Sequence, residues 1–260
     1  MEQPTKNHKL GWRLLLIVCS VALVASLIAM LAHFLPRRPA ADRLVPQPTT
    51  TTTAADKPAP LPDNPIDFAA LQAKNPDTVA YIQIPGTIID YPIMSSAKGS
   101  DGKDFYINHN ADGTAHRAGA IYIQRYLNAP DFSDPNTVVY GHNMANGSMF
   151  SWLHQYKKKA FFDEHRTILI YTPGHILTYK VYSAFLYDNR HILNSFNFQN
   201  EEDYAAFIAQ TLKPSTMTKQ VRDDVSVTTQ SRILTLSTCA GSSSQRYLVV
   251  GVLIDDQPTK

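Results

Sequence analysis

The sequence predicts a mostly β domain, a barrel or a sandwich with added helices, behind an N-terminal transmembrane helix. Short strand-like stretches bounded by turn residues follow one another along most of the chain, and none alternates with helices as βαβ units do. An uncharged apolar stretch near the N-terminus, followed by a proline-rich stretch, predicts the anchor and a spacer. The composition, 44% hydrophobic, can support a real core.

The anchor is predicted at Leu14–Leu35, where no residue carries a formal charge. As a helix this stretch is about 33 Å long, close to the thickness of a bilayer's hydrocarbon core. The apolar region of a cleavable signal peptide is usually shorter, about 7–15 residues, so we expect an uncleaved anchor. Basic residues flank both ends equally. The short tail 1–13 therefore decides the orientation, and we expect it in the cytoplasm with the body of the chain exported.

Residues 36–65 are predicted to be an extracellular linker. They contain eight prolines and the run Thr49–Thr53. Such a segment cannot bury a core, favours extended conformations and holds the following domain away from the membrane. The domain itself is predicted at 66–260. The net charge of +2, with charges of both signs interspersed, gives no long basic stripe, so nucleic acid is not an expected partner.

Three helices are predicted in the domain. Ile66–Lys74 forms a short helix that Asn75-Pro76-Asp77 ends. Ser148–Lys158 places Met149, Trp152, Leu153 and Tyr156 at helical spacing. Glu201–Leu212 follows Asn200 as N-cap and has acidic residues in its first turn, which suits the helix dipole.

The strands are predicted from alternating or continuous apolar runs that end at turn residues such as Pro85-Gly86. In chain order they are Val79–Ile84, Ile88–Tyr91, Gly119–Ile123, Thr137–Gly141, Thr167–Tyr171, Leu177–Leu186, Val225–Thr229, Arg232–Thr238 and Tyr247–Ile254.

Cys239 is the candidate reactive group. An exported domain lies in an oxidising compartment, where cysteines normally pair. The other cysteine, Cys19, lies within the predicted anchor, so Cys239 has no bridge to make. It ends a buried strand, and Arg246 opens the next one after a short Gly/Ser loop. Two such antiparallel strands place Cys239 and Arg246 side by side, with backbones about 5 Å apart.

His142 is the candidate base, because a thiol needs a base or a lowered pKa to act as a nucleophile. It follows the apolar run Thr137–Gly141, so it too lies at the tip of a buried strand. No metal or cofactor is expected, since the sequence has no HExxH motif and one thiolate is too few for structural zinc. Six other histidines are expected at the surface: His109, His116, His154, His165, His175 and His191.

The motifs Tyr140-Gly141-His142-Asn143-Met144 and Thr235-Leu236-Ser237-Thr238-Cys239, with Arg246, resemble those of the class B sortases. These are membrane-anchored cysteine transpeptidases of Gram-positive bacteria, and the likeness extends over roughly Ile66–Ile254. The resemblance implies an eight-stranded β-barrel with an N-terminal helix and an inserted helix at Glu201–Leu212. It also implies that no metal is used.

The resemblance further implies a role for each candidate. Cys239 attacks a threonine carbonyl in a C-terminal sorting signal that is NPxTN-like or (S/P)PxTG-like. His142 protonates the leaving amine and later takes a proton from the incoming amine, while Arg246 donates hydrogen bonds to the substrate backbone or the oxyanion. The residues expected to bind the substrate are Asn143, Ser237 and Thr238.

The implied substrates are secreted proteins that carry such a signal, and the implied acceptor is an amine of a peptidoglycan precursor or of a pilin. The domain then faces the cell wall, while its anchor contacts membrane lipid. The loop Ala240–Gln245 is shorter than in several relatives and leaves the signal and the acceptor open. Two alternatives also remain. One is another wall-directed cysteine transpeptidase or hydrolase, although an SxGCxR signature is missing, and the other is a non-catalytic surface binding module with a buried cysteine.

Overall fold

The computed structural model describes residues 60–98, 105–241 and 244–260. The predicted tail 1–13, the anchor Leu14–Leu35 and residues 36–59 of the predicted linker 36–65 lie outside these residues. Over the part of the chain that is described, no helix has the length and apolarity needed to cross a membrane.

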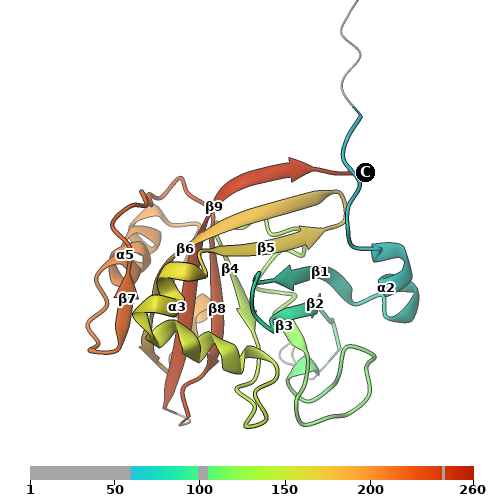
Figure 1. Cartoon of the computed structure of the whole chain (residues 1–260), viewed down its shortest axis with the longest axis horizontal. Helices are drawn as coiled ribbons and strands as arrows, with labels where there is room; N and C mark the ends of the chain where they lie inside the picture. Colours follow the sequence, from blue (N-terminus) through green and yellow to red (C-terminus); the bar gives the residue numbers. More distant parts are fainter. Residues whose placement is uncertain (1–59, 99–104, 242–243) are drawn as a thin grey trace, which may run out of the picture. The chain divides into compact units, whose positions relative to one another are not determined.

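Nine strands form one sheet whose order is β5-β1-β2-β3-β4-β8-β9-β6-β7 (Figure 1). A further pairing of β5 with β6 closes eight of them into a barrel, and β7 extends the sheet beyond β6. The pairs β2–β3 and β4–β8 are parallel, and the others are antiparallel. The expected eight-stranded barrel is therefore confirmed. The strands are β1 Thr78–Gln83, β2 Asp90–Met94, β3 Ile121–Ile123, β4 Asn136–Tyr140, β5 Thr167–Thr172, β6 His175–Asp188, β7 Lys219–Val221, β8 Ile233–Cys239 and β9 Gln245–Pro258.

One predicted strand is wrong. The segment Val225–Thr229 forms no strand, and the strand of this region is β7, a few residues earlier. Val225 and Val227 pack against a buried cluster, which accounts for the alternating pattern without a ladder. The strand predicted at Ile88–Tyr91 begins later, at Asp90, because Ile84 N–H bonds to the Ile89 carbonyl and closes a turn there.

The helices agree with the prediction except in the middle of the chain. α2 (Phe68–Lys74) is capped by the Asp67 carboxylate, and α5 (Glu201–Leu212) by the Asn200 side chain, which accepts from the Asp203 N–H. The predicted helix Ser148–Lys158 is instead a 3-10 helix, η2 (Phe150–Lys157), and a short α-helix follows it. The helical segments not predicted are η1 Phe105–Ile107, α3 Lys159–Glu164 and α4 Ile192–Ser195.

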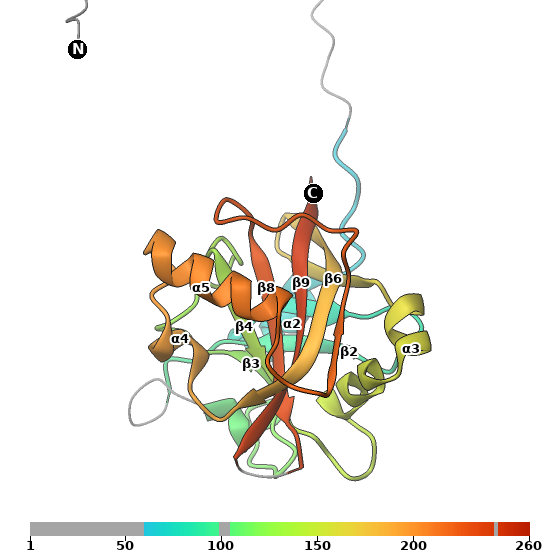
Figure 2. The ribbon, with the colours of Figure 1, turned by 90° about the vertical axis from the view of Figure 1, so that its left-hand side faces the viewer.

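Two large apolar clusters hold the strands that carry the site. The first fills the barrel and includes Ile82, Ile170 and Val249. The second lies outside the barrel, where α5 covers β8 and β9 with Phe207 and neighbouring side chains (Figure 2). Because both faces of β8 are covered, all of its residues up to Thr238 are buried. Only the tip of β8 emerges from the core, which fixes the position of Cys239.

Candidate active site

Cys239 and Arg246 face each other at the open end of β8 and β9. They are register partners, as expected, and Arg246 Nη1 donates a hydrogen bond to Cys239 Sγ at 2.9 Å. The next pair is joined by a backbone bond from Ala240 N–H to the Gln245 carbonyl. Cys239 and Arg246 therefore form a pair without backbone hydrogen bonds, in which side chains approach most closely. This register brings the guanidinium over the sulfur.

The surroundings of Cys239 differ from those of an inert core cysteine. The residue is only half-buried, so a substrate can reach the sulfur. The guanidinium of Arg246 is a permanent cation with a rigid fork of donors. A cation beside a partly exposed thiol is the environment typical of reactive cysteines.

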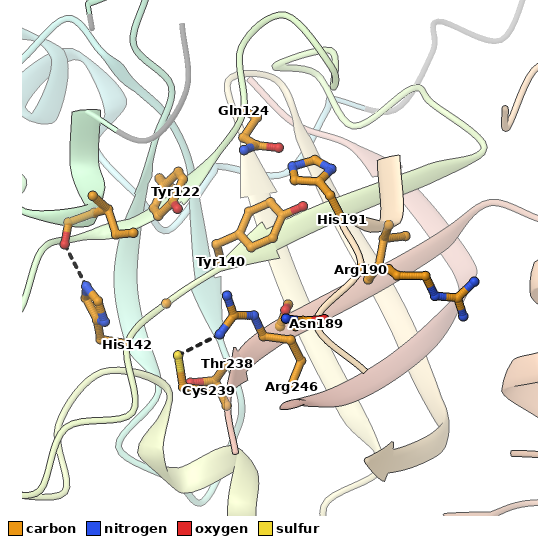
Figure 3. A pocket seen from close by; sticks show the side chains of 14 residues that line it. Tyr122, Gln124, Tyr140, His142, Asn189, Arg190, His191, Thr238, Cys239 and Arg246 are labelled. Atoms are coloured by element: carbon orange, nitrogen blue, oxygen red, sulfur yellow. Dashed lines mark hydrogen bonds between the residues drawn. The ribbon is translucent and has the colours of Figure 1, made fainter. Parts of the chain in front are cut away.

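His142 leaves the end of β4 and turns toward η1 (Figure 3). Its Nε2 atom lies 2.6 Å from the Ile107 carbonyl oxygen. A carbonyl only accepts, so Nε2 carries a hydrogen and donates it. The preceding Gly141 permits this path, because a Cβ there would lie 2.5 Å from Ile121 Cδ1 and 2.8 Å from the Phe150 ring.

A pocket of about 140 Å³ joins these groups. Its wall carries an aromatic row in which the rings of Tyr122 and Tyr140 lie 5.5 Å apart and those of Tyr140 and His191 lie 6.2 Å apart. The His142 ring and the Cys239 sulfur lie on the same side of this pocket, yet the ring points to Ile107 and the sulfur to Arg246 (Figure 3). The full lining comprises Ile107, Tyr122, Gln124, Tyr140, Gly141, His142, Asn189, Arg190, His191, Ile192, Ser237, Thr238, Cys239 and Arg246.

The three residues expected to bind substrate are not equivalent. Ser237 and Thr238 are buried and line the pocket, whereas Asn143 is exposed and lies outside its lining. Among the described residues, no group accepts from or donates to the Thr238 hydroxyl, although that oxygen is buried.

Two histidines predicted at the surface are partly buried at the site instead. His191 lines the pocket, beyond the end of β6. His154 lies on η2, and its Nε2 is 2.9 Å from the Cys239 carbonyl oxygen. Burial lowers the pKa of His154, and nearby Lys157 lowers it further, while the bond to the Cys239 carbonyl opposes them. No local pattern distinguishes His154 in the sequence, since only the fold carries η2 to the end of β8.

A metal centre has no support in the described ranges, where no three His, Cys, Asp or Glu side chains gather closely enough to hold an ion. The arrangement instead offers a thiol, an imidazole and a guanidinium around one small pocket. These are the groups that acyl transfer through a thioester requires.

The chain is similar to proteins of one family. The family model described as the sortase domain matches residues 82–254. Sortase B of Staphylococcus aureus is 30% identical over 190 residues, which cover 72% of this chain and 74% of that protein. Sortase B of Listeria monocytogenes is 35% identical over 172 residues, 65% of each chain.

Solved structures of sortase B are also similar to this chain. Clostridium perfringens sortase B has a TM-score of 0.63 at 30% identity, covering 72% of this chain and 99% of that one. The Staphylococcus aureus sortase B–substrate complex has a TM-score of 0.62 at 28% identity, covering 72% of this chain and 84% of that one.

Proposed function

Because the chain belongs to the class B sortases, which are cysteine transpeptidases, we propose that its Cys239 cleaves a C-terminal sorting signal and passes the cleaved protein to an amine. The observation that carries this proposal is the 2.9 Å bond from Arg246 to the Cys239 sulfur, beside a pocket that His142 also lines.

The first half-reaction forms a thioacyl enzyme. The Cys239 thiol gives its proton to His142, and the thiolate attacks the threonine carbonyl carbon, so that an S–C bond forms as the carbonyl oxygen becomes an oxyanion. The Arg246 guanidinium, released from the sulfur as the latter bonds to carbon, donates to that oxygen. The C–N bond then breaks, and His142 gives a proton to the departing amine. The C-terminal remainder of the signal leaves.

The second half-reaction reverses these roles. An incoming amine attacks the thioester carbonyl, and His142 takes a proton from its nitrogen. The S–C bond breaks, the departing sulfur takes the proton from His142 so that the thiol of Cys239 is restored, and a new amide joins the two partners. His142 must leave the Ile107 carbonyl to serve either half-reaction, because its ring is turned toward that oxygen in the resting structure.

The signal is proposed to be NPxTN-like or (S/P)PxTG-like, and the acceptor to be a peptidoglycan-precursor amine or a pilin lysine. Ser237 and Thr238 line the pocket where the signal's backbone would lie, and Asn143, which lies outside that lining, is proposed as a further substrate contact. The proposed cytoplasmic tail is residues 1–13, the membrane anchor is residues 14–35 and the linker is residues 36–65. This places residues 66–260 outside the cell, facing the wall.

The test uses the full-length chain purified in detergent and peptides carrying each signal. Mass spectrometry should detect cleavage after threonine and a thioacyl adduct on Cys239. The variant Cys239→Ala should form neither product. Cleavage by Cys239→Ala at the wild-type rate would exclude the mechanism.

A further inference from the structure

The carbonyl of Cys239 lies beyond the end of the neighbouring strand β4. Ser237, two residues earlier, accepts the Gly141 N–H across the β4–β8 pair. Backbone groups of a strand point to the same side at every second residue, so the Cys239 carbonyl also points toward β4. However, β4 ends at Tyr140. His154 takes its place and donates Nε2–H to this carbonyl at 2.9 Å.

Packing holds the His154 ring in this position. The ring stacks on Tyr247 of β9, with centroids 5.2 Å apart and an angle of 30° between the planes. The neighbouring Leu153 and Tyr156 are fully buried and anchor η2 to the barrel. Tyr247 is itself the register partner of Thr238. The imidazole is therefore held between the Tyr247 ring of β9 and the Cys239 carbonyl at the end of β8.

We propose that His154 is a positioning residue for the nucleophile. By holding the peptide unit between Cys239 and Ala240, it fixes the backbone from which the sulfur projects, and so keeps the sulfur beside Arg246. A displacement of about 1 Å at a reacting atom can cost on the order of 10²-fold in rate. This inference rests on the proposed role of Cys239 as nucleophile.

The same contact makes the position of Cys239 dependent on pH. The Nδ1 atom of His154 is buried and has no hydrogen-bond partner among the described residues. The ionisable groups brought against the ring are Lys157 on η2, Tyr247 on β9 and Cys239 on β8. None is a carboxylate, so within the described ranges a proton added at Nδ1 has no anion beside it. The bond to the Cys239 carbonyl favours the protonated ring, but burial outweighs it, so protonation favours a ring exposed to water and releases that carbonyl.

The test compares three variants of the full-length chain in detergent. His154→Phe retains a ring to stack on Tyr247 but has no donor. His154→Gln retains an amide donor at similar reach and does not titrate. The matched control is His175→Gln, since His175 pairs with Asp256 far from the pocket lining. Two rates are measured from pH 5.5 to 7.5, the cleavage of the signal peptide and the alkylation of Cys239 by iodoacetamide.

We expect His154→Phe to lower kcat about tenfold and to leave KM within about twofold of the wild-type value. This loss is smaller than the rate loss that a displacement of the sulfur by about 1 Å can cause. The variant His154→Gln should restore most of the lost kcat. The ratio of the His154→Gln rate to the wild-type rate should rise as the pH falls, while the ratio for His175→Gln stays flat. A folded His154→Phe protein with wild-type kcat would overturn the inference. So would a His154→Gln loss equal to that of His154→Phe.

Alkylation separates this inference from the proposed function, because iodoacetamide needs no sorting signal. If the wild-type chain cleaves no peptide, the proposed function fails, yet a pH-dependent alkylation ratio for His154→Gln still supports positioning. If His154→Phe does not fold, the ratio of the His154→Gln alkylation rate to the wild-type rate tests the inference instead. A ratio that does not change with pH would overturn it.

Discussion

The imidazole of His142 donates a hydrogen bond of 2.6 Å to the Ile107 carbonyl, on the side of the ring away from the Cys239 thiol (Figure 3). The bond ties the segment after β4 to η1, whose last residue, Ile107, lines the pocket. A signal peptide that enters the pocket meets Ile107 as well as His142. Substrate binding can therefore exchange this bond and free the ring for proton transfer.

Replacing His142 by glutamine should lower signal cleavage about 10²- to 10⁴-fold, the usual contribution of a general acid or base. Release of the C-terminal peptide in a single turnover measures the loss. The matched control, His175→Gln, should cleave at nearly the wild-type rate. Equal rates for the two variants would remove His142 from the mechanism.

Arg246→Lys should lower kcat by roughly 10²-fold even though the positive charge remains. An ammonium lacks the planar fork of donors that can hold the oxyanion while the sulfur reacts. Steady-state cleavage of the signal peptide gives kcat and KM separately. Arg166→Lys serves as the control, because Arg166 is half-exposed and pairs with Asp224. An Arg246→Lys enzyme with unchanged kcat would contradict the proposed role.

Most of the barrel could be predicted because its strands are buried and apolar. The expected bounds of α5 are those observed, since its cap and its apolar face are both local signals. The middle of the chain was less predictable. The spacing of apolar residues in 148–158 suits an α-helix, but Phe150 N–H bonds to the His142 carbonyl and the segment tightens into η2. Such a contact between segments leaves no local pattern.

The residues of the site were likewise predictable only in part. Cys239, Arg246 and His142 lie at strand tips, so the ends of apolar runs mark them in the sequence. His154 and His191 reach the site through folding, because η2 crosses the end of β8 and the segment after β6 turns back to the pocket. Each has one apolar and one polar neighbour in the sequence, so nothing local separates them from surface histidines.

Gly141→Ala should destabilise the domain by about 1–3 kcal/mol and also lower kcat. The new Cβ overlaps Ile121 Cδ1 and the Phe150 ring, and the shift needed to relieve this moves His142. Urea unfolding and signal cleavage measure the two effects. Adding Ile121→Val removes the nearest overlapping atom, so the double variant should be more stable than the sum of the single changes predicts. If the changes in the free energy of unfolding were strictly additive, atoms other than Ile121 Cδ1 would be the ones that move to relieve the overlap.

Arg222→Met should destabilise the fold by about 2–4 kcal/mol and leave KM unchanged. Arg222 has a buried side chain that donates to the carbonyls of Val181 and Phe162, and methionine leaves both without a donor. Arg166→Met is the matched control, because its half-exposed ion pair is worth little, and its change should stay within about 0.5 kcal/mol. Equal urea midpoints for the two variants would contradict this assignment.

His154 should make the domain less stable as the pH falls below about 6.5. Burial lowers the pKa of its imidazole in the folded chain, whereas the unfolded chain has the ordinary value near 6.5. Between the two values the unfolded chain binds more protons, so the free energy of unfolding rises with pH across this window and falls as acid is added.

The measurement is the urea midpoint of the full-length chain at pH 7.5 and at pH 5.5. The wild-type midpoint should fall more between these values than that of His154→Gln, which has no imidazole to protonate. His175→Gln should follow the wild-type curve, because it leaves His154 in place. Carboxylates with a lowered pKa, such as Asp131 beside Ser133, lose their contribution only at lower pH, below the ordinary value near 3.9. A difference between the wild-type and His154→Gln curves within this window therefore arises from His154. Parallel curves would show that protonation of its ring does not lower the free energy of unfolding.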